Sequence, residues 1–147
     1  MTSREEIVAQ ARRWIGTPYR HQASTLGAGA DCLGLIRGVW RNLIGAEPEA
    51  MPAYTPDWSE TTGDEDLLLA AGRWLRPKPL TSIDIGDVII FRMRSTSVAK
   101  HLGLTATQQG MPTFVHAYTG HGVIETALSA PWQRKIAGRF EFPRGDH

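Results

Sequence analysis

The spacing of hydrophobic positions changes near Pro79 and divides the chain into two parts. Before this point apolar residues recur every three or four positions, which is typical of helices with one buried face. After it, apolar and polar residues alternate, which is typical of strands. Helices followed by a series of neighbouring strands predict an α+β fold with an antiparallel sheet.

Three helices are predicted in the first part of the chain. The first begins at a capping box formed by Ser3 and Glu6, and the second has Asp31 placed to cap its N-terminus. The third follows Asp64, which is placed to cap it, and ends before Pro77. The expected bounds of the first two helices are residues 3–15 and 32–44.

The segment between the second and third helices, residues 47–63, contains three prolines and is predicted to be irregular. Its aromatic residues Tyr54 and Trp58 either hold the loop against the protein or contact a partner. The sequence leaves both interpretations open.

About five strands are predicted after Pro79. The strongest runs from Asp87 to Met93 and is entered through a turn at Gly86. Turns that carry glycine separate the others. These other strands are expected at residues 100–107, 113–118, 122–126 and 135–142.

Two histidines are predicted to lie side by side on the sheet. Matching the apolar faces of two neighbouring strands pairs Leu102 with Val115 and puts a short turn near Gln108-Gln109-Gly110. The same register sets His101 directly opposite His116, with Cβ atoms about 5 Å apart. A slip of two positions would keep both imidazoles on one face, opposite the aliphatic face.

Composition and charge narrow the possible functions. The 147 residues are expected to form a single domain, residues 1–147, and the net charge of +1 comes without a long basic or acidic block. We therefore expect no direct nucleic acid binding and no membrane contact. The charged N-terminus lacks the apolar core of a signal peptide, so synthesis in the cytoplasm is expected.

The only cysteine, Cys32, lies at the predicted start of the second helix. The helix dipole and free backbone N–H groups there favour a thiolate, so Cys32 is a candidate nucleophile; the alternative is a small buried apolar residue. A cysteine nucleophile needs a base, and that base needs a third polar group to orient it. Cys32, His101 and His116 fill these roles. The same side chains would also make a zinc site with an open position, but no local His-x-x-x-His spacing is present, so we expect no metal and no other cofactor.

These motifs give the chain a resemblance to the NlpC/P60 cysteine peptidases, and most closely to their bacteriophage tail and gene-transfer-agent branch. The resemblance covers nearly the full length and follows the family's order from nucleophile to base. The matching segments are Gly16-Thr17-Pro18-Tyr19, Asp31-Cys32-Leu33-Gly34-Leu35, Ile85-Gly86-Asp87-Val88-Ile89-Ile90-Phe91, His101-Leu102-Gly103-Leu104 and Val115-His116-Ala117.

The resemblance implies a circularly permuted, papain-like α+β fold, with N-terminal helices packed on an antiparallel sheet of about five strands. It also implies that Cys32 attacks a carbonyl carbon, that His101 takes the thiol proton and that His116 orients His101. Tyr19 would lie beside the nucleophile and help to polarise the substrate. Asp31 would cap its helix or, as in relatives, hold a substrate amine.

The chain departs from the family pattern at two positions expected on the substrate side. Leu33 follows the nucleophile where the family usually has serine, and Arg20-His21-Gln22-Ala23 stands where the family usually has a Gly-Gly pair. His21 itself is expected on the surface. Arg92 and Lys100 flank the strand of the base and are candidates for binding substrate carboxylates; the alternative is an ordinary solvated basic face.

By this resemblance we expect a thiol protease of the cell wall, a hydrolase that cuts the stem peptides of peptidoglycan. Its expected place is a virion-like particle, docked on phage-like tail-hub or tail-tip proteins. There it would act in the periplasm or cell wall of a target cell and open the wall for DNA delivery. Two alternatives remain open: a catalytically silent tail-hub subunit of the same fold, and an amidase or acyltransferase that uses the same triad.

Overall fold

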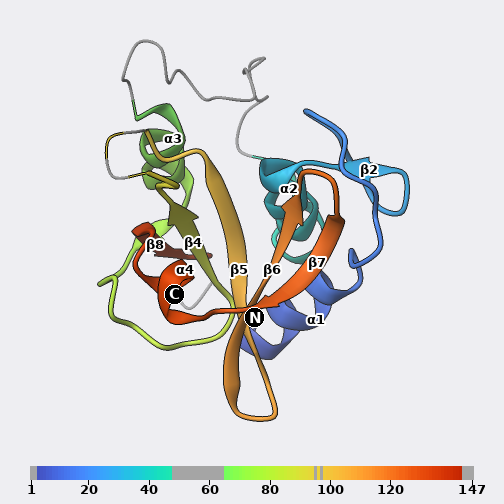
Figure 1. Ribbon diagram of the computed structural model, residues 1–147. Coiled ribbons are helices and arrows are strands. Elements are labelled where there is room, and N and C mark those ends of the chain that lie inside the picture. The colour runs from blue at the N-terminus through green and yellow to red at the C-terminus, as the bar shows by residue number, and fades with distance from the viewer. Residues whose placement is uncertain (1–2, 48–64, 95, 97, 144–147) are drawn as a thin grey trace.

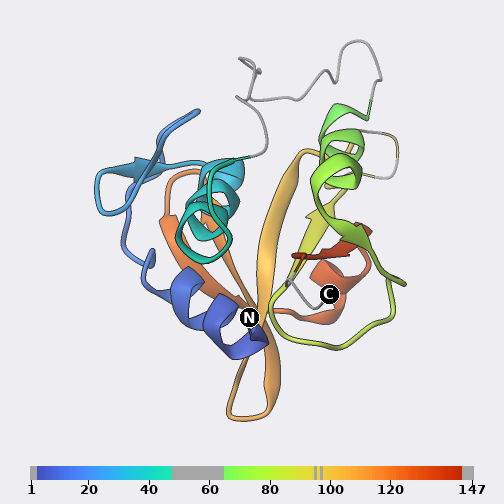
Figure 2. The same cartoon turned by 180° about the vertical axis from the view of Figure 1, so that it is seen from behind.

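The computed structural model describes residues 3–47, 65–94, 96 and 98–143. They form three layers, in which helices α1, α2 and α3 cover one face of a central sheet and the short helix α4 covers the other (Figure 1, Figure 2). In chain order the elements are α1 (Arg4–Arg12), β1 (Ser24–Thr25), β2 (Gly29–Ala30), α2 (Cys32–Leu43), α3 (Asp66–Trp74), β3 (Arg76–Pro77), β4 (Asp87–Phe91), β5 (His101–Gln108), β6 (Met111–Tyr118), β7 (Gly122–Ala127), α4 (Ala130–Gln133) and β8 (Ile136–Glu141).

The central sheet is antiparallel and has six strands in the order β3-β8-β4-β5-β6-β7, where about five were predicted. The additional strand is β3, whose residues Arg76 and Pro77 pair with β8. Two residues that include a proline carry no alternating pattern from which a strand could be predicted. The last strand, β8, returns to lie between β3 and β4 and does not extend the series formed by β4 to β7. The predicted α+β class is confirmed.

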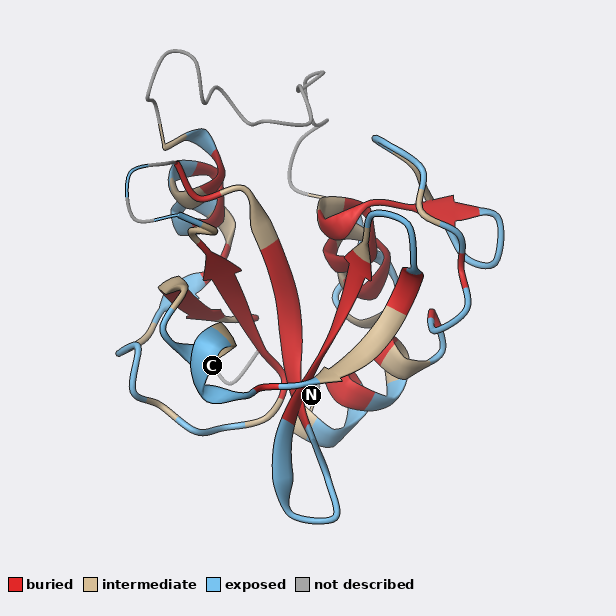
Figure 3. Cartoon of the chain, in the orientation of Figure 1, coloured by how far each residue is buried: buried red, intermediate tan, exposed pale blue. Residues whose placement is uncertain are grey.

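The two faces of the sheet carry different side chains, and both are buried at the centre of the molecule (Figure 3). The face toward α1, α2 and α3 is aliphatic, and its sheet residues include Val88, Ile90, Leu102, Leu104, Val115 and Ala117. The face toward α4 is aromatic, and its cluster includes Ile89, Phe91, Phe114 and Trp132.

Helix α1 begins as predicted and ends earlier than predicted. Ser3 Oγ accepts a hydrogen bond from the Glu6 backbone N–H (3.1 Å), and the Ser3 N–H donates to Glu6 Oε1 (3.0 Å). The capping box is therefore confirmed. The helix ends at Arg12 and not at residue 15. The following turn still buries Trp14, which is 1% exposed, so the apolar spacing that predicted a longer helix is satisfied without one.

The register of β5 and β6 differs from the predicted register by two residues. Leu104, and not Leu102, pairs with Val115. The turn is Gln109-Gly110, and its two residues have φ values of 52° and 79°. A two-residue hairpin turn of this kind needs positive φ at both positions, which glycine adopts without strain. The predicted pairing of Leu102 with Val115 was therefore wrong by two residues, although the observed turn lies within the predicted Gln108-Gln109-Gly110 segment.

The predicted loop aromatics Tyr54 and Trp58 and the predicted cap Asp64 lie outside the described residues. The described part of α3 begins at Asp66, and no side chain caps it. Across the described ranges, no helix has both the length and the apolar character needed to cross a membrane.

A buried carboxylate joins four parts of the fold. Asp87, at the start of β4, has no exposed side-chain surface. It accepts hydrogen bonds from Arg4 of α1 (2.7 Å), Lys78 after β3 (2.8 Å) and Arg139 of β8 (2.8 Å). Three cations around one carboxylate compensate for the loss of water around its charge.

Candidate active site

Cys32 is the first residue of α2, and Asp31 holds the start of this helix in place. One Asp31 carboxylate oxygen accepts from the backbone N–H of Gly34 (2.7 Å), and the other accepts from that of Gln22 (2.7 Å). Asp31 is only 2% exposed. Of the two roles expected for Asp31, the structure therefore shows the helix cap.

Cys32 lines a cavity of about 200 Å³ where the N-terminus of α2 meets β5 and β6. Its sulfur accepts a hydrogen bond from the backbone N–H of Leu102, the residue that follows His101. The fold thus brings Cys32 and His101, which are far apart in the sequence, to one cavity. The described residues that line it are Tyr19, His21, Asp31, Cys32, Met93, Lys100, His101, Ala117, Tyr118 and Thr119.

His101 and His116 form the second part of the site. His101 Nε2 lies 2.7 Å from His116 Nδ1, and the ring centroids are 5.0 Å apart. The other ring nitrogen of His116, Nε2, lies 2.8 Å from Thr126 Oγ1 of β7. Because Nε2 of His101 is hydrogen-bonded to His116, Nδ1 is the nitrogen of His101 that remains available to a group in the cavity.

Aromatic side chains enclose the two histidines on the α4 face of the sheet. The ring centroid of Trp132 lies 6.1 Å from that of His101 and 5.7 Å from that of His116. Phe91 packs on His101 at 5.8 Å and Phe114 packs on His116 at 4.2 Å. His116 consequently has no exposed surface. This cover was missed from the sequence because α4, which carries Trp132, is too short to show a helical period.

The site therefore combines a thiol at a helix start with an imidazole that is hydrogen-bonded to a second imidazole. The sequence matches the NlpC/P60 family over residues 16–140, a span that contains Cys32, His101 and His116. The chain belongs to the NlpC/P60 family. This confirms the family that the motifs indicated.

Individual NlpC/P60 relatives are distant in sequence. The chain is 28% identical over 132 residues to the murein DD-endopeptidase MepS/murein LD-carboxypeptidase of Escherichia coli (strain K12), a match that covers 90% of this chain and 58% of that protein. It is 29% identical over 133 residues to the gamma-DL-glutamyl hydrolase of Bacillus subtilis (strain 168), covering 90% of this chain and 28% of that protein. The chain thus spans less than two thirds of the length of each of these relatives.

Solved structures show the same fold. The NlpC/P60 domain of the peptidoglycan hydrolase SagA matches with a TM-score of 0.63 and 19% identity, covering 96% of this chain and 100% of that one. An NlpC/P60 family protein from Bacillus cereus matches with a TM-score of 0.64 and 14% identity, covering 96% of this chain and 40% of that one.

Burial favours uncharged side chains in this NlpC/P60 site. It raises the pKa of the Cys32 thiol to about 12, helped by the negative charge of Asp31 and opposed by nearby backbone N–H groups. It lowers the pKa of His101 to about 4 and, together with neighbouring imidazoles, that of His116 to about 3. The expectation that the helix start would favour a thiolate was therefore wrong in its net effect. The backbone N–H groups lower the pKa of the thiol, as expected, but burial raises this pKa by more.

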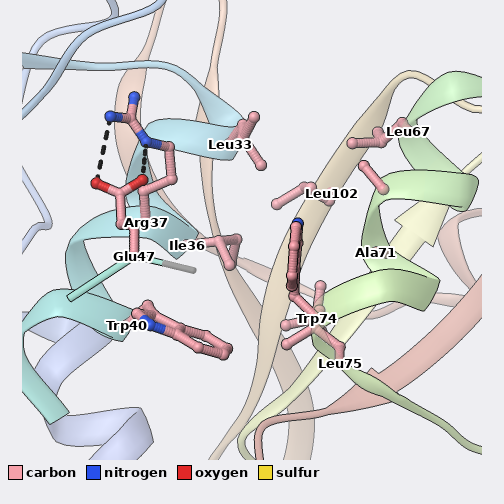
Figure 4. Close-up of a pocket in the computed structure, with 12 residues that line it drawn as sticks. Leu33, Ile36, Arg37, Trp40, Glu47, Leu67, Ala71, Trp74, Leu75 and Leu102 are labelled. Carbon is pink, nitrogen blue, oxygen red and sulfur yellow. Dashed lines mark hydrogen bonds and ion pairs between the residues drawn. The ribbon is translucent and has the colours of Figure 1, made fainter. Parts of the chain in front are cut away.

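Leu33, where the family usually has serine, lines a different cavity. This second cavity, of about 70 Å³, lies between α2 and α3 (Figure 4). Its other residues are mostly apolar and include Ile36, Trp40, Leu67, Ala71, Trp74 and Leu102. Leu33 was expected on the substrate side, but one helical step of about 100° separates it from Cys32 and turns it toward α3.

Three of the four predicted substrate-binding residues line the Cys32 cavity, namely Tyr19, Asp31 and Lys100. Burial raises the pKa of the Tyr19 hydroxyl, and a hydrogen bond with Thr119 opposes this shift. His21, which the sequence placed on the surface, is exposed as expected but also lines the cavity, with Nδ1 3.8 Å from Asp31 Oδ2.

Arg92, the fourth of these residues, has a different place. It is not among the described residues that line the Cys32 cavity. Its guanidinium pairs with Glu65, the residue that precedes α3. Glu65 also accepts from the backbone N–H of Ala99, 2.9 Å away, in the segment that leads to β5. Arg92 therefore helps to join α3 to this segment, and the pattern of charges along the sequence gave no sign of this partner.

Besides His21, sequence reasoning missed four residues of the cavity wall, and only one of these four had a signal in the sequence. Tyr118 alternates with His116 in β6, so it shares the face of the histidines. The others are Met93, Ala117 and Thr119.

As for the zinc alternative, no three His, Cys, Asp or Glu side chains are grouped to hold a metal ion within the described ranges.

Proposed function

We propose that the chain is a thiol-dependent peptidoglycan hydrolase that cuts an amide bond in the stem peptides. The observation that supports this most is that Cys32 and His101 line one cavity while His116 holds His101 by a hydrogen bond. Similarity to a murein DD-endopeptidase and to a gamma-DL-glutamyl hydrolase supports the substrate class.

In the first step, Cys32 Sγ bonds to the carbonyl carbon while the thiol proton passes to His101 Nδ1. Because burial keeps both groups neutral beforehand, proton transfer accompanies the attack. The carbonyl oxygen becomes an oxyanion and accepts from the backbone N–H of Cys32 at the helix start. His116 Nδ1 accepts the Nε2–H of His101 and stabilises the imidazolium that forms.

In the second step, the imidazolium of His101 gives its proton to the leaving amine nitrogen as the C–N bond breaks. The acyl group stays on Cys32 as a thioester. Water then attacks the thioester while His101 takes one of its protons. The C–S bond breaks, the proton returns to sulfur and a carboxylic acid leaves. In this proposal Tyr19 and Lys100 contact the substrate around the scissile bond, which their place in the wall of the same cavity supports.

The test compares the wild-type protein with Cys32→Ala on purified sacculi. We expect the wild type to release muropeptides and Cys32→Ala to release none above background, because alanine keeps α2 but removes the nucleophile. Gly72→Ala, at an exposed position of α3, is the matched control and should keep full activity. Equal release by wild type and Cys32→Ala would reject the proposal.

Mass spectrometry of the products separates this activity from its alternatives. A new amine inside the stem peptide identifies an endopeptidase. Release of the whole stem from the glycan identifies an amidase, and coupling of the stem to an added amine identifies an acyltransferase. The proposal expects the first result.

We further propose that the enzyme works in a phage-like or gene-transfer-agent tail particle that opens the wall for DNA delivery. The resemblance of the motifs to that branch of the family supports this. Particles that carry Cys32→Ala should assemble normally but fail to open sacculi. If wild-type and Cys32→Ala particles open sacculi equally, the chain is instead a catalytically silent tail-hub subunit. If the protein is absent from purified particles, both the enzymatic and the structural role in the particle are rejected.

A further inference from the structure

Thr126 contacts His116, the histidine of the pair that is not among the residues lining the Cys32 cavity. It lies in β7, opposite Phe114 of β6, and its Oγ1 is 2.8 Å from His116 Nε2. Together with the 2.7 Å contact between His116 Nδ1 and His101 Nε2, this makes a continuous chain of hydrogen bonds that ends at the cavity. The three groups lie on three neighbouring strands: His101 on β5, His116 on β6 and Thr126 on β7.

Only two arrangements of protons satisfy this chain while both rings are neutral. In the first, His101 Nε2–H donates to His116 Nδ1, and His116 Nε2–H donates to Thr126. In the second, all the donors are reversed: Thr126 donates to His116, and His116 donates to His101. The second arrangement places the remaining proton of His101 on Nδ1. Such a ring cannot accept the thiol proton of Cys32.

We propose that Thr126 is a positioning residue that selects the first arrangement by accepting the Nε2–H of His116. This inference rests on the proposed function, because it assigns Thr126 to the same catalytic site. Thr126 touches neither the cavity nor the sulfur, and it acts only through the two rings. The same acceptor is needed again when His101 becomes an imidazolium, since His116 Nδ1 must then stay unprotonated.

Among the described residues, Thr126 Oγ1 is the partner found for His116 Nε2. Its ring is fully buried, and Phe114 and Trp132 pack on it with centroids 4.2 and 5.7 Å away. Removing the hydroxyl would leave a buried N–H without a partner. The proton of His116 would then be more stable on Nδ1, because from there it can be donated to His101 Nε2. This is the second arrangement, in which His101 cannot accept the thiol proton.

The test uses Thr126→Val, which keeps the shape of the side chain but removes the hydroxyl. We expect kcat on sacculi to fall about 10- to 100-fold, the range that corresponds to an unpaired buried N–H, with KM unchanged. Thr126→Ser should restore most of the activity. Thr107→Val, at an exposed position of β5, is the matched control and should match the wild type.

A second readout needs no substrate. Nitrogen NMR of the imidazoles at neutral pH should show the His116 proton on Nε2 in the wild type and in Thr126→Ser, and on Nδ1 in Thr126→Val. If Thr126→Val keeps the proton on Nε2, or if valine and serine reduce kcat equally, the inference is wrong. If the proton moves as expected but the wild type releases no muropeptides, the positioning of the rings stands and the proposed function fails.

Discussion

The rings of His101 and His116 touch through Nε2 and Nδ1, 2.7 Å apart, although the two residues are not opposite each other in β5 and β6. The pair Leu104 and Val115 sets the register, and continuing it by one residue places Gly103 opposite His116. The missing side chain at Gly103 leaves space for this diagonal contact. Diagonal neighbours in a sheet are within reach of aromatic side chains.

Gly103→Ala is predicted to separate the two rings. A Cβ there would lie 2.9 Å from Phe114 Cδ2, 3.0 Å from the Val115 carbonyl oxygen and 3.1 Å from His116 Cβ. The backbone and Cβ atoms cannot move aside cheaply, so we expect a loss of about 1–3 kcal/mol in the free energy of unfolding and a loss of activity. Urea unfolding and muropeptide release measure the two effects.

The control for this substitution is Gly72→Ala in α3, where an added Cβ meets no atom within 4 Å. It should raise the free energy of unfolding by about 0.5–1 kcal/mol, because alanine is the better helix residue. If Gly103→Ala behaved like Gly72→Ala, the steric account of the histidine contact would be refuted.

The activity is predicted to persist to unusually low pH. Burial lowers the pKa of His101 to about 4, so its base form dominates above that pH. The thiol, with its pKa raised to about 12, stays protonated through the neutral range. A pH profile of kcat/KM should therefore show its acid limb near pH 4, well below the usual 6.5 of histidine, and no alkaline limb near pH 8. An acid limb near 6.5 would show that His101 is solvated in the working enzyme.

The free energy of unfolding is predicted to fall as the pH decreases from about 6.5 toward about 3. His116 has a pKa of about 3 when folded, chiefly because of burial, and about 6.5 when unfolded. The unfolded state therefore binds more protons in this window, and the stability present above pH 6.5 is lost on acidification. At about pH 5 the contribution of His116 alone amounts to about 2 kcal/mol, and His101, with its lowered pKa, adds to the loss in the same direction. Urea unfolding at about pH 7 and about pH 5 measures it, and the same slope in His116→Asn would contradict the assignment.

Trp132→Ala is predicted to raise the pKa of His116 toward its usual value. The indole covers both histidines from α4, and its removal admits water to their rings. Proton NMR titration of the imidazoles measures the shift. Trp132→Phe retains an apolar cover and should leave the pKa low. If the pKa of His116 were equally low in Trp132→Ala, burial by this side chain would not be its cause.

The local features of the site could be predicted from the sequence. Cys32 was expected at a helix start capped by Asp31, because the cap and the apolar face of α2 are encoded within one short segment. His101 and His116 were expected on one sheet face, because alternation alone decides the face. The two histidines still contact each other in the observed register, because a shift of two residues keeps each side chain on the same face of the sheet.

Features that depend on distant parts of the chain could not be predicted in the same way. Arg92 was expected to bind a substrate carboxylate or to lie on a solvated basic face, but it pairs with Glu65, which precedes α3. Thr126 looked like an ordinary strand residue, because its partner His116 lies across the sheet. The net pKa of Cys32 depends on burial by the whole fold, which no local pattern reports.

The carboxylate of Asp87 bears on the order in which the protein is completed during synthesis. Arg4 is synthesised before Asp87 and Arg139 after it, and both bind this one anion inside the fold. Until β8 has emerged, β4 lacks one of its two neighbouring strands and Asp87 lacks one of its three cations. The pairing of β4 with β8 and the cluster of three cations around Asp87 therefore form only after Arg139 has been added to the chain.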